Sequence, residues 1–506
     1  MKTSKLLSTL LGVSLLTTAM ISCKDKEGMA PVIQLPEMAP EISFTALTED
    51  GEIQTYDARE LNSSNTSMVI KGLASGESII SIDYRPATGQ LYGLSSMSRL
   101  YIINENSGMA TQLGAGPFSP AISGENASID FNPTVDRIRL VTESGQNLRL
   151  HPELGTVVAT DGNINGGMNP RIGAVAYTNS FSGATSTILF DIDFEQDKLY
   201  QQVPPNEGGL QEVGDLRVDF EGLGDMDITE DNKFALAVNR NIEESRLYAI
   251  NLMSGKAIWI GTFNDPVVSL AVKTSPIAFA SDSTNKLYRF NPNDPEPTSV
   301  SLTGLMSGEM IVGLDFRPAN GQLVAVSSMS KLYSVNTASG ALAPIGTGFS
   351  PMIMGDFIGF DFNPTVDRIR LVTNQGQNLR LHPDLGTAVF VDGTLKPGTP
   401  MVNSAAYLNN FAGATTTTLF VLDSGNGMLY TQTPPNEGLL VPVGSLGVSF
   451  MEDNGFDIGG TSNKAFAVLT TTSGSGVYSI NLMTGAATKV SDLNFKPTAM
   501  ALGLGF

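Results

Sequence analysis

The sequence predicts an all-β protein, a β-propeller of ten four-stranded blades built from a duplicated five-blade unit. Three observations predict this fold class. The chain of 506 residues contains a long internal duplication, and each half contains a finer period of 44–51 residues. No run shows a helical period for longer than two turns.

The duplication relates residues from about 43 to 273 to residues from about 276 to 506. The string FNPTVDRIRLVT occurs at 131–142 and again, unchanged, at 362–373. Shortly after each copy follows GQNLRLHP, at 145–152 and 376–383. Two identical strings in otherwise diverged halves indicate a shared physical constraint.

The finer period appears as a four-letter strand start that recurs ten times, from SIDY and SIDF to GFDI and AMAL. Its third letters lie at 83, 130, 176, 227, 271, 315, 361, 406, 457 and 501. Inside one unit, residues 81–114 divide into four short alternating runs separated by turns such as PATGQ and ENSG. This spacing and content are typical of one propeller blade per unit.

The two ends of the folded part suggest how the blades close. The chain ends on PTAMALGLGF, a lone first strand, and begins with ISFTALTEDGEIQTYD, which looks like strands two and three of a unit. We expect the C-terminal strand to complete the N-terminal blade and close one ten-bladed ring, which removes an exposed sheet edge. The alternative is two five-bladed rings. The single ring is preferred because only about three residues join the last strand of the first half to the first strand of the second half, a hairpin-length link.

The N-terminus resembles the signal of a bacterial lipoprotein. Residues 1–22 combine a basic start with an apolar stretch too short to span a bilayer, and Ser22 precedes Cys23 as in a lipobox. Cys23, the only cysteine, is therefore predicted to carry a lipid. Residues 23–41 form the predicted tether, followed by propeller halves at 42–273 and 274–506. The KDKE run after the cysteine resembles export signals of surface lipoproteins of the Bacteroidota, so we expect an outer-membrane lipoprotein of the cell envelope, facing the periplasm or the cell surface.

Composition excludes some functions. A formal charge of −20 and a pI near 4.5 argue against nucleic acid as a partner, because phosphate binding needs Lys and Arg. The same charge is compatible with a cationic partner or ligand. One Trp and two His limit stacking platforms and His-based chemistry.

The repeated string concentrates arginines in an acidic protein, which suggests an anion site in each half. The anion could be a small ligand, and the candidate ligand-binding residues are Arg137, Arg139, Arg149, His151, Arg368, Arg370, Arg380 and His382. In the alternative, these arginines pair with Asp130, Asp136, Asp361 and Asp367 and join adjacent blades. A two-residue Ser144–Gly145 turn would place Arg139 opposite Leu150, so the four side chains of one half need not converge.

The third letters of the strand starts form a second set of candidates. Six are Asp: 83, 130, 227, 315, 361 and 457. If they face the channel, they form an acidic ring that could hold Ca²⁺ through oxygen ligands. In the alternative, each Asp caps its own turn by accepting backbone N–H groups. No metal site is predicted, because no Asp-dense loop has metal-binding spacing.

The motifs DYRPATGQLYGLSS, DFNPTVDRIRLVT and GQNLRLHP resemble the bacterial family called domain of unknown function 4394, in two tandem copies. That resemblance implies secretion but no established activity, so no catalytic residue and no cofactor are predicted. The predicted function is that of a lipid-anchored extracytoplasmic β-propeller that binds a ligand or an unknown protein. The alternative is a propeller hydrolase or lyase acting on an extracellular polymer such as a polysaccharide. The convergence of carboxylates with perturbed pKa in a pocket would favour the enzyme.

Overall fold

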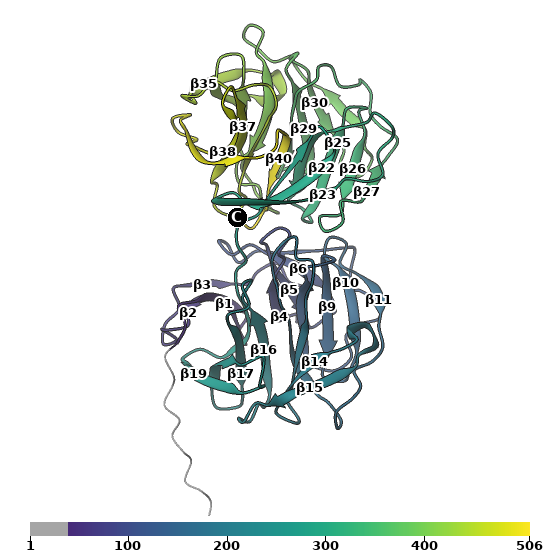
Figure 1. The fold of residues 1–506 in the computed structure, drawn as a ribbon, viewed down its shortest axis with the longest axis vertical. Helices are drawn as coiled ribbons and strands as arrows, with labels where there is room; N and C mark the ends of the chain where they lie inside the picture. Colours follow the sequence, from purple (N-terminus) through teal and green to yellow (C-terminus); the bar gives the residue numbers. More distant parts are fainter. Residues whose placement is uncertain (1–38) are drawn as a thin grey trace, which may run out of the picture. The chain divides into compact units, whose positions relative to one another are not determined.

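The computed structural model describes residues 39–506, so the predicted signal peptide, Cys23 and most of the tether lie outside the described residues. The described part forms ten four-stranded antiparallel sheets (Figure 1) and two short 3₁₀ turns, η1 (Pro205–Glu207) and η2 (Pro435–Glu437). The prediction of an all-β propeller with ten four-stranded blades is confirmed. In this part of the chain, no helix is long and apolar enough to cross a membrane.

Strands β1 to β20 form the five blades of the first half. Within each blade the strands are adjacent in sequence order, except that β20 supplies the inner strand of the blade of β1, β2 and β3. The strands of this half are β1 (Ser43–Thr48), β2 (Glu52–Asp57), β3 (Thr66–Val69), β4 (Ile79–Tyr84), β5 (Leu91–Ser95), β6 (Leu100–Ile103), β7 (Ala110–Gln112), β8 (Ala127–Asn132), β9 (Arg137–Thr142), β10 (Asn147–His151), β11 (Thr156–Thr160), β12 (Ile172–Tyr177), β13 (Leu189–Asp193), β14 (Lys198–Gln202), β15 (Leu210–Asp215), β16 (Leu223–Ile228), β17 (Ala235–Arg240), β18 (Ser245–Ile250), β19 (Ala257–Phe263) and β20 (Val267–Ala271).

Strands β21 to β40 repeat this arrangement, and β40 supplies the inner strand of the blade of β21, β22 and β23. The strands of this half are β21 (Ala278–Asp282), β22 (Lys286–Asn291), β23 (Asp294–Ser301), β24 (Ile311–Arg317), β25 (Gln322–Ser327), β26 (Leu332–Val335), β27 (Leu342–Ile345), β28 (Ile358–Asn363), β29 (Arg368–Thr373), β30 (Asn378–Leu381), β31 (Ala388–Val391), β32 (Val402–Tyr407), β33 (Leu419–Asp423), β34 (Met428–Gln432), β35 (Leu440–Ser445), β36 (Asn454–Ile458), β37 (Ala465–Thr471), β38 (Gly474–Ile480), β39 (Ala487–Leu493) and β40 (Pro497–Leu502).

The inner strands contact one another in two cycles of five. In the first half β4, β8, β12, β16 and β20 follow one another and return to β4, and in the second half β24, β28, β32, β36 and β40 return to β24. The expectation of one ten-bladed ring is therefore wrong, and the alternative of two five-bladed rings describes the molecule. The C-terminal strand does not complete the N-terminal blade, because β20 pairs with β1 and β40 pairs with β21.

The link between the halves explains the error. Strand β20 ends at Ala271 and β21 begins at Ala278, so six residues rather than three join them. The two strands do not form a hairpin, because each pairs with a strand of its own half. An extended link of that length reaches about 20 Å, enough for the chain to leave one ring as an inner strand and enter the next as a second strand.

The core lies between neighbouring blades, because both faces of each blade are covered. Strand β9 shows the pattern: Ile138 and Leu140 pack towards the preceding blade, among residues such as Leu94. Val141, on the other face, packs against the following blade beside Tyr177. A polar residue on such a strand is buried between blades and needs a partner there.

Candidate functional site

The aspartates of the strand starts join adjacent inner strands of the first ring. Asp83 accepts the N–H of Tyr84 at 2.7 Å and, from the next blade, the N–H of Phe131 at 2.8 Å. Asp130 in turn accepts the N–H of Tyr177, one blade further on, at 3.1 Å. These aspartates therefore accept backbone N–H groups, as the alternative interpretation predicted. However, Asp83 and Asp130 also accept an N–H group of the next blade and so hold neighbouring blades together.

The second ring repeats these bonds residue by residue. Asp315 accepts the N–H of Phe362 at 2.6 Å, and Asp361 accepts that of Tyr407 at 3.0 Å. The last inner strand is attached in the same way, since Leu502 N–H donates to Asp457 at 2.6 Å. Asp227 does the same for Val272 in the first ring.

Because there are two rings, the six aspartates form two buried triads rather than one acidic ring. In each triad one carboxylate oxygen per residue lies within 4.8 Å of the others; the triads are Asp83, Asp130 and Asp227, and Asp315, Asp361 and Asp457. Burial, followed by repulsion between neighbouring carboxylates, raises the pKa of Asp83 and Asp130 well above the usual value. Burial also raises the pKa of Asp227 and of Asp457 to about 7. A proton held within a triad would relieve this repulsion.

A second layer of buried polar side chains lies next to the first triad, on residues two positions earlier in the inner strands of the first ring. Asp225, fully buried, accepts hydrogen bonds from the hydroxyls of Ser81, Ser128 and Ser269 at 2.5–2.8 Å. Each serine oxygen also accepts a backbone N–H of the next blade. Burial raises the pKa of Asp225 to about 7, although these hydroxyls lower it. With these bonds, including that of Val175 on β12, the Asp225–serine cluster joins all five inner strands of the first ring.

The second ring has no room for such a cluster at the equivalent positions, which carry Gly313, Gly359, Ser404, Gly455 and Ala499. A Cβ on Gly359 would lie 2.6 Å from the backbone of Ser404, and one on Gly455 would lie 2.5 Å from that of Met500. At these glycines the neighbouring inner strands approach too closely for a side chain. The axial layers of the two rings are filled in different ways.

A cavity of about 180 Å³ opens directly next to the Asp225–serine cluster. Four of its lining residues, Ile80, Ala127, Gly224 and Val268, immediately precede Ser81, Ser128, Asp225 and Ser269 in the chain. The cavity therefore lies at the end of the axis where the inner strands of the first ring begin. The other lining residues are Glu49, Ser78, Ile79, Glu125, Asn126, Gly173, Gly222 and Leu223.

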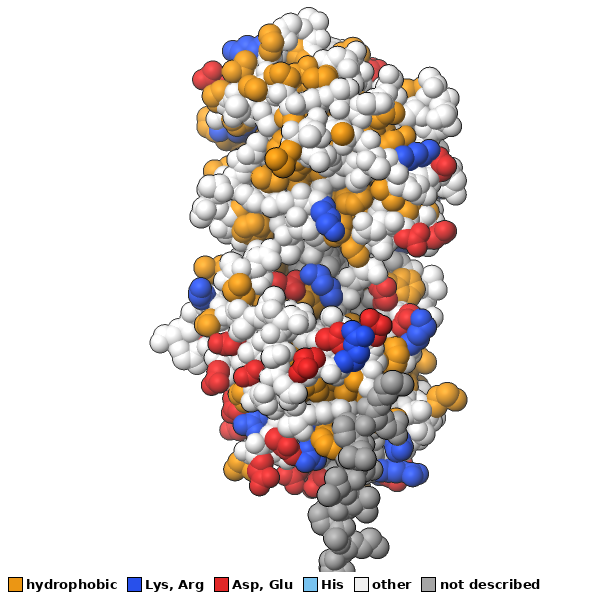
Figure 2. All heavy atoms as spheres, turned by 90° about the vertical axis from the view of Figure 1, so that its left-hand side faces the viewer, with side chains coloured by type: hydrophobic (Ala, Val, Ile, Leu, Met, Phe, Trp, Pro, Cys, Tyr) orange, Lys and Arg blue, Asp and Glu red, His pale blue; other side chains and the backbone are white. Residues whose placement is uncertain are grey.

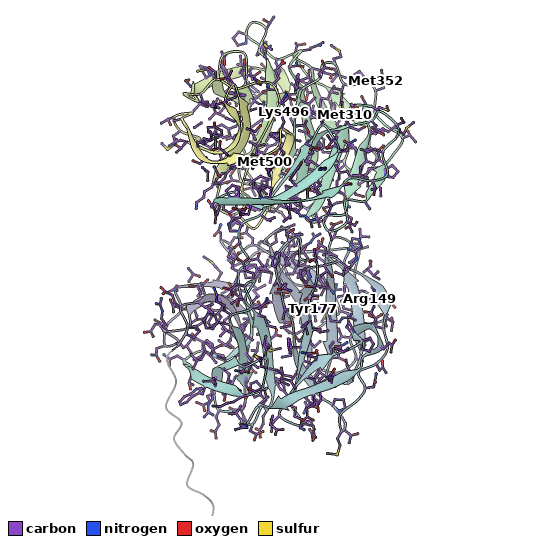
Figure 3. The ribbon with its side chains drawn as sticks, in the orientation of Figure 1. Arg149, Tyr177, Met310, Met352, Lys496 and Met500 are labelled. Atoms are coloured by element: carbon purple, nitrogen blue, oxygen red, sulfur yellow. The ribbon has the colours of Figure 1, made fainter. Side chains whose placement is uncertain are left out.

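The repeated arginine string serves mainly to join blades. Arg139, with 2% of its side chain exposed, donates to Asp161 at 2.6 Å, to Asn147 at 2.7 Å and to Asn206 of the next blade at 2.8 Å. Arg149 donates to the same Asp161 at 2.8 Å. Burial raises the pKa of Asp161, but the hydrogen bonds and charges of Arg149 and Arg139 outweigh this and hold the pKa below its usual value. Figure 3 shows Arg149 on β10 and Tyr177 on the neighbouring blade.

The second ring contains the same network, in which Arg370 and Arg380 share Asp392. The predicted partners of Arg139 and Arg370 were wrong, since both arginines pair with the Asp that follows the fourth strand of their own blade. The expected parity was wrong too. Arg139 lies opposite Arg149 because Thr142 pairs with Gln146, so the turn holds three residues, 143–145, rather than two.

Asp136, Arg137 and His151 of the repeated string lie in a separate cluster around Arg85. Arg85, fully buried, donates to Asp136 of the next blade at 2.9 Å and to Glu153 at 2.9 Å. His151 lies beside this cluster, and burial together with the charges of Arg137 and Arg85 lowers its pKa to about 4. The eight candidate residues thus divide into two clusters per half, and anion binding by them stays a prediction.

The second ring has an equivalent of this cluster, in which Arg317 donates to Asp367 at 2.9 Å and to Asp384 at 2.6 Å. Arg368 donates to the carbonyl of Asp367 at 2.8 Å, and His382 accepts the N–H of Asp384 at 3.2 Å.

A family model described as "Domain of unknown function (DUF4394)" matches residues 52–271 and again residues 286–503. The chain belongs to this family. The predicted resemblance, in two tandem copies, is confirmed. No curated protein matches the chain.

Solved structures similar to this DUF4394 protein include three with low identity. The Dos1 propeller is 11% identical, covering 66% of this chain and 92% of that one, with a TM-score of 0.25. PorZ, a surface component of the type-IX secretion system of Porphyromonas gingivalis, is 12% identical over 90% of this chain and 60% of that one, with a TM-score of 0.26. The extracellular domain of BT4673 from B. thetaiotaomicron is also 12% identical, over 90% and 71%, with a TM-score of 0.26. The fold assignment rests on the strand pairing.

Sequence reasoning missed two sets of residues in this DUF4394 chain. The first letters of the strand starts SIDY, SIDF, DMDI and SLAV are the four members of the Asp225–serine cluster. Arg85 and Arg317 occur in the motifs DYRPATGQ and DFRPANGQ, where each arginine directly follows an inner strand or ends it. The sequence signal was present in both cases, as a polar residue repeated at one position of the unit.

The raised pKa values predict that stability falls as pH rises from about 5 to 8. Asp225 and Asp227 have a pKa of about 7 when folded, against an ordinary 3.8, so between these values the folded state holds protons that the unfolded state has released. Each such group costs about 1.4 kcal/mol per pH unit across that interval. We expect a higher melting temperature at pH 5.5 than at pH 8, and a shallower dependence in Asp225→Asn. A melting temperature that is flat or rises over this range would contradict the assignment.

Proposed function

We propose that this protein is a binding protein anchored in the cell envelope through Cys23, with its ligand site in the axial cavity of the first ring. The cavity and its position carry the proposal. It lies at the end of a ring axis, where residues from all five blades meet, which is a common place for ligand sites in closed β-architectures. The second ring has the same strand arrangement but carries glycines in the equivalent layer, so we assign the ligand site to the first ring alone.

Binding is favoured over hydrolysis by the state of the carboxylates. Asp225 and the triads do converge and do have raised pKa values, which would suit general acids. However, both oxygens of Asp225 already accept hydrogen bonds from serines, and Asp83 and Asp227 accept backbone N–H groups. The pKa values of these carboxyl groups are raised by burial within the ring, and their oxygens are already bonded to the protein. We therefore assign them a structural role rather than a role in hydrolysis.

Filling the cavity tests the site. We expect Leu223→Trp to place an indole in the 180 Å³ space and to abolish binding of ligands found for the wild type by a thermal-shift screen of metabolites and oligosaccharides. Ile242→Trp is the matched control, because Ile242 is 94% exposed on a turn. Hits whose shift persists in Leu223→Trp, or a screen without hits, would exclude the cavity as the site.

The anchor is tested separately. We expect Cys23→Ala to prevent lipidation and to move the protein from the membrane fraction to the soluble fraction, since a lipid chain is the predicted membrane attachment. The measurement is fractionation after a high-salt wash, with metabolic labelling of the lipid. A variant that still sediments with membranes would refute the anchor and leave the cavity proposal unaffected.

A further inference from the structure

We propose that the axial cavity of the first ring binds a small organic cation, an aliphatic ammonium group carried on a short apolar chain. This inference rests on the proposed function and names its ligand class. Three features of the described first ring lead to it: the charge at the cavity rim, the chemistry of its walls, and the unequal charge of the two halves.

The rim of the cavity is acidic. Glu49 and Glu125 both line it, and its other lining residues include no basic side chain. Arg240 approaches Glu49 to 3.4 Å from outside the lining. On the other side, Glu143 accepts the backbone N–H of Glu125 and is neutralised by Arg171, at 2.7 Å. The carboxylate of Glu125 thus provides a negative charge at the opening.

The floor and the walls complete the recognition. Asp225 follows the lining residue Gly224 in the chain, so a buried carboxyl group bonded to serines lies near the inner end of the cavity, opposite the acidic opening. Between them the walls are apolar, with Ile79, Ile80 and Val268. The side chains of Ile79, Ile80 and Val268 supply no oxygen ligand to a Ca²⁺ ion, which needs six to eight. They instead suit the alkyl part of an amine, whose ammonium group then meets the carboxylates.

The charge of the whole first half acts in the same direction. Residues 42–273 contain 30 acidic and 15 basic residues, whereas residues 274–506 contain 16 and 11. Figure 2 shows red acidic side chains gathered on the first-half blades. A cleft within a surface of one sign of charge raises the local concentration of the opposite ion. The first ring is therefore the one suited to a cation.

Three probes of equal chain length test the ligand class by calorimetry or NMR titration on the full chain: n-pentylammonium, 1-pentanol and pentanoate. We expect n-pentylammonium to bind with a dissociation constant of about 1 mM. It should bind about three- to tenfold more tightly than 1-pentanol, the range that one partly shielded charge pair gives. Pentanoate should not bind. Raising NaCl from 0.05 to 0.5 M should remove most of the preference, because salt screens the carboxylates.

Matched variants assign the effect to the cavity. Glu125→Gln should lower the ammonium preference to about twofold or less, whereas Asp356→Asn, at the equivalent position of the second ring, should leave it unchanged. Equal binding of n-pentylammonium and 1-pentanol, or a preference for pentanoate, would overturn the cation inference. If Leu223→Trp still abolishes that binding, the proposed ligand site stands without the cation. If none of the probes binds while other screened ligands do so in the cavity, the cation inference also fails.

Discussion

Replacement of Arg139 or Arg370 by alanine should lower the free energy of unfolding by about 3 kcal/mol or more. Each guanidinium lies between two blades with 2% of its side chain exposed. Arg139 bonds Asp161, Asn147 and Asn206, so its loss removes a donor from buried side-chain oxygens on β10, just after β11 and in η1. Arg149 keeps Asp161 partly compensated, so the loss should fall near the lower end of the range for a broken buried pair. Chemical denaturation of each variant gives the measurement.

Arg59→Ala provides the control for these variants. Arg59 is half-exposed and pairs with Glu41 and Asp57 at the surface, so its removal should leave the free energy of unfolding almost unchanged. If Arg139→Ala and Arg370→Ala both unfold like the wild type, the interblade role is wrong. Anion binding would then be the better explanation for the repeated string.

The fold class could be predicted from the sequence because each blade is a local unit. The 44–51-residue period, the alternating runs and the turn residues all act within one blade, where pairing is between consecutive strands. Ring closure could not be predicted in the same way. The inner strands β20 and β40 have similar sequences, and either could complete the blade of β1. The choice depends on pairing between strands more than 200 residues apart, about which local patterns say nothing.

The site shows the same division between local and distant information. Arg139 and Arg370 lie buried between blades, as one of the two alternatives predicted, but their predicted partners were wrong. The prediction assumed a two-residue turn, which would place Arg149 and Arg139 on opposite faces of the blade. In the structure they lie on the same face and share Asp161, a partner that the assumed turn did not allow. The cavity could not be predicted at all, because its walls come from five strands. Only their assembly at the axis brings Glu49 and Glu125 to one opening.

Deletion of residues 497–506 should unfold the second ring and leave the first ring folded. The deleted segment contains β40, which lies between β36 and β24 and buries Met500, Leu502, Leu504 and Phe506. At about 1.5–3 kcal/mol for each buried side chain, the loss approaches the whole stability of a typical domain. The first ring keeps its own closing strand, β20, and every bond that Asp83, Asp130 and Asp227 make to the next blade. Hydrogen exchange measured by mass spectrometry should therefore show protection lost in 278–494 and retained in 43–271. Thr498→Ala, which keeps the strand and removes one hydroxyl, should exchange like the wild type. Loss of protection in both rings would contradict two independently closed rings and favour the single ring that the link between the halves first suggested. Unchanged protection in both rings would contradict the closing role of β40.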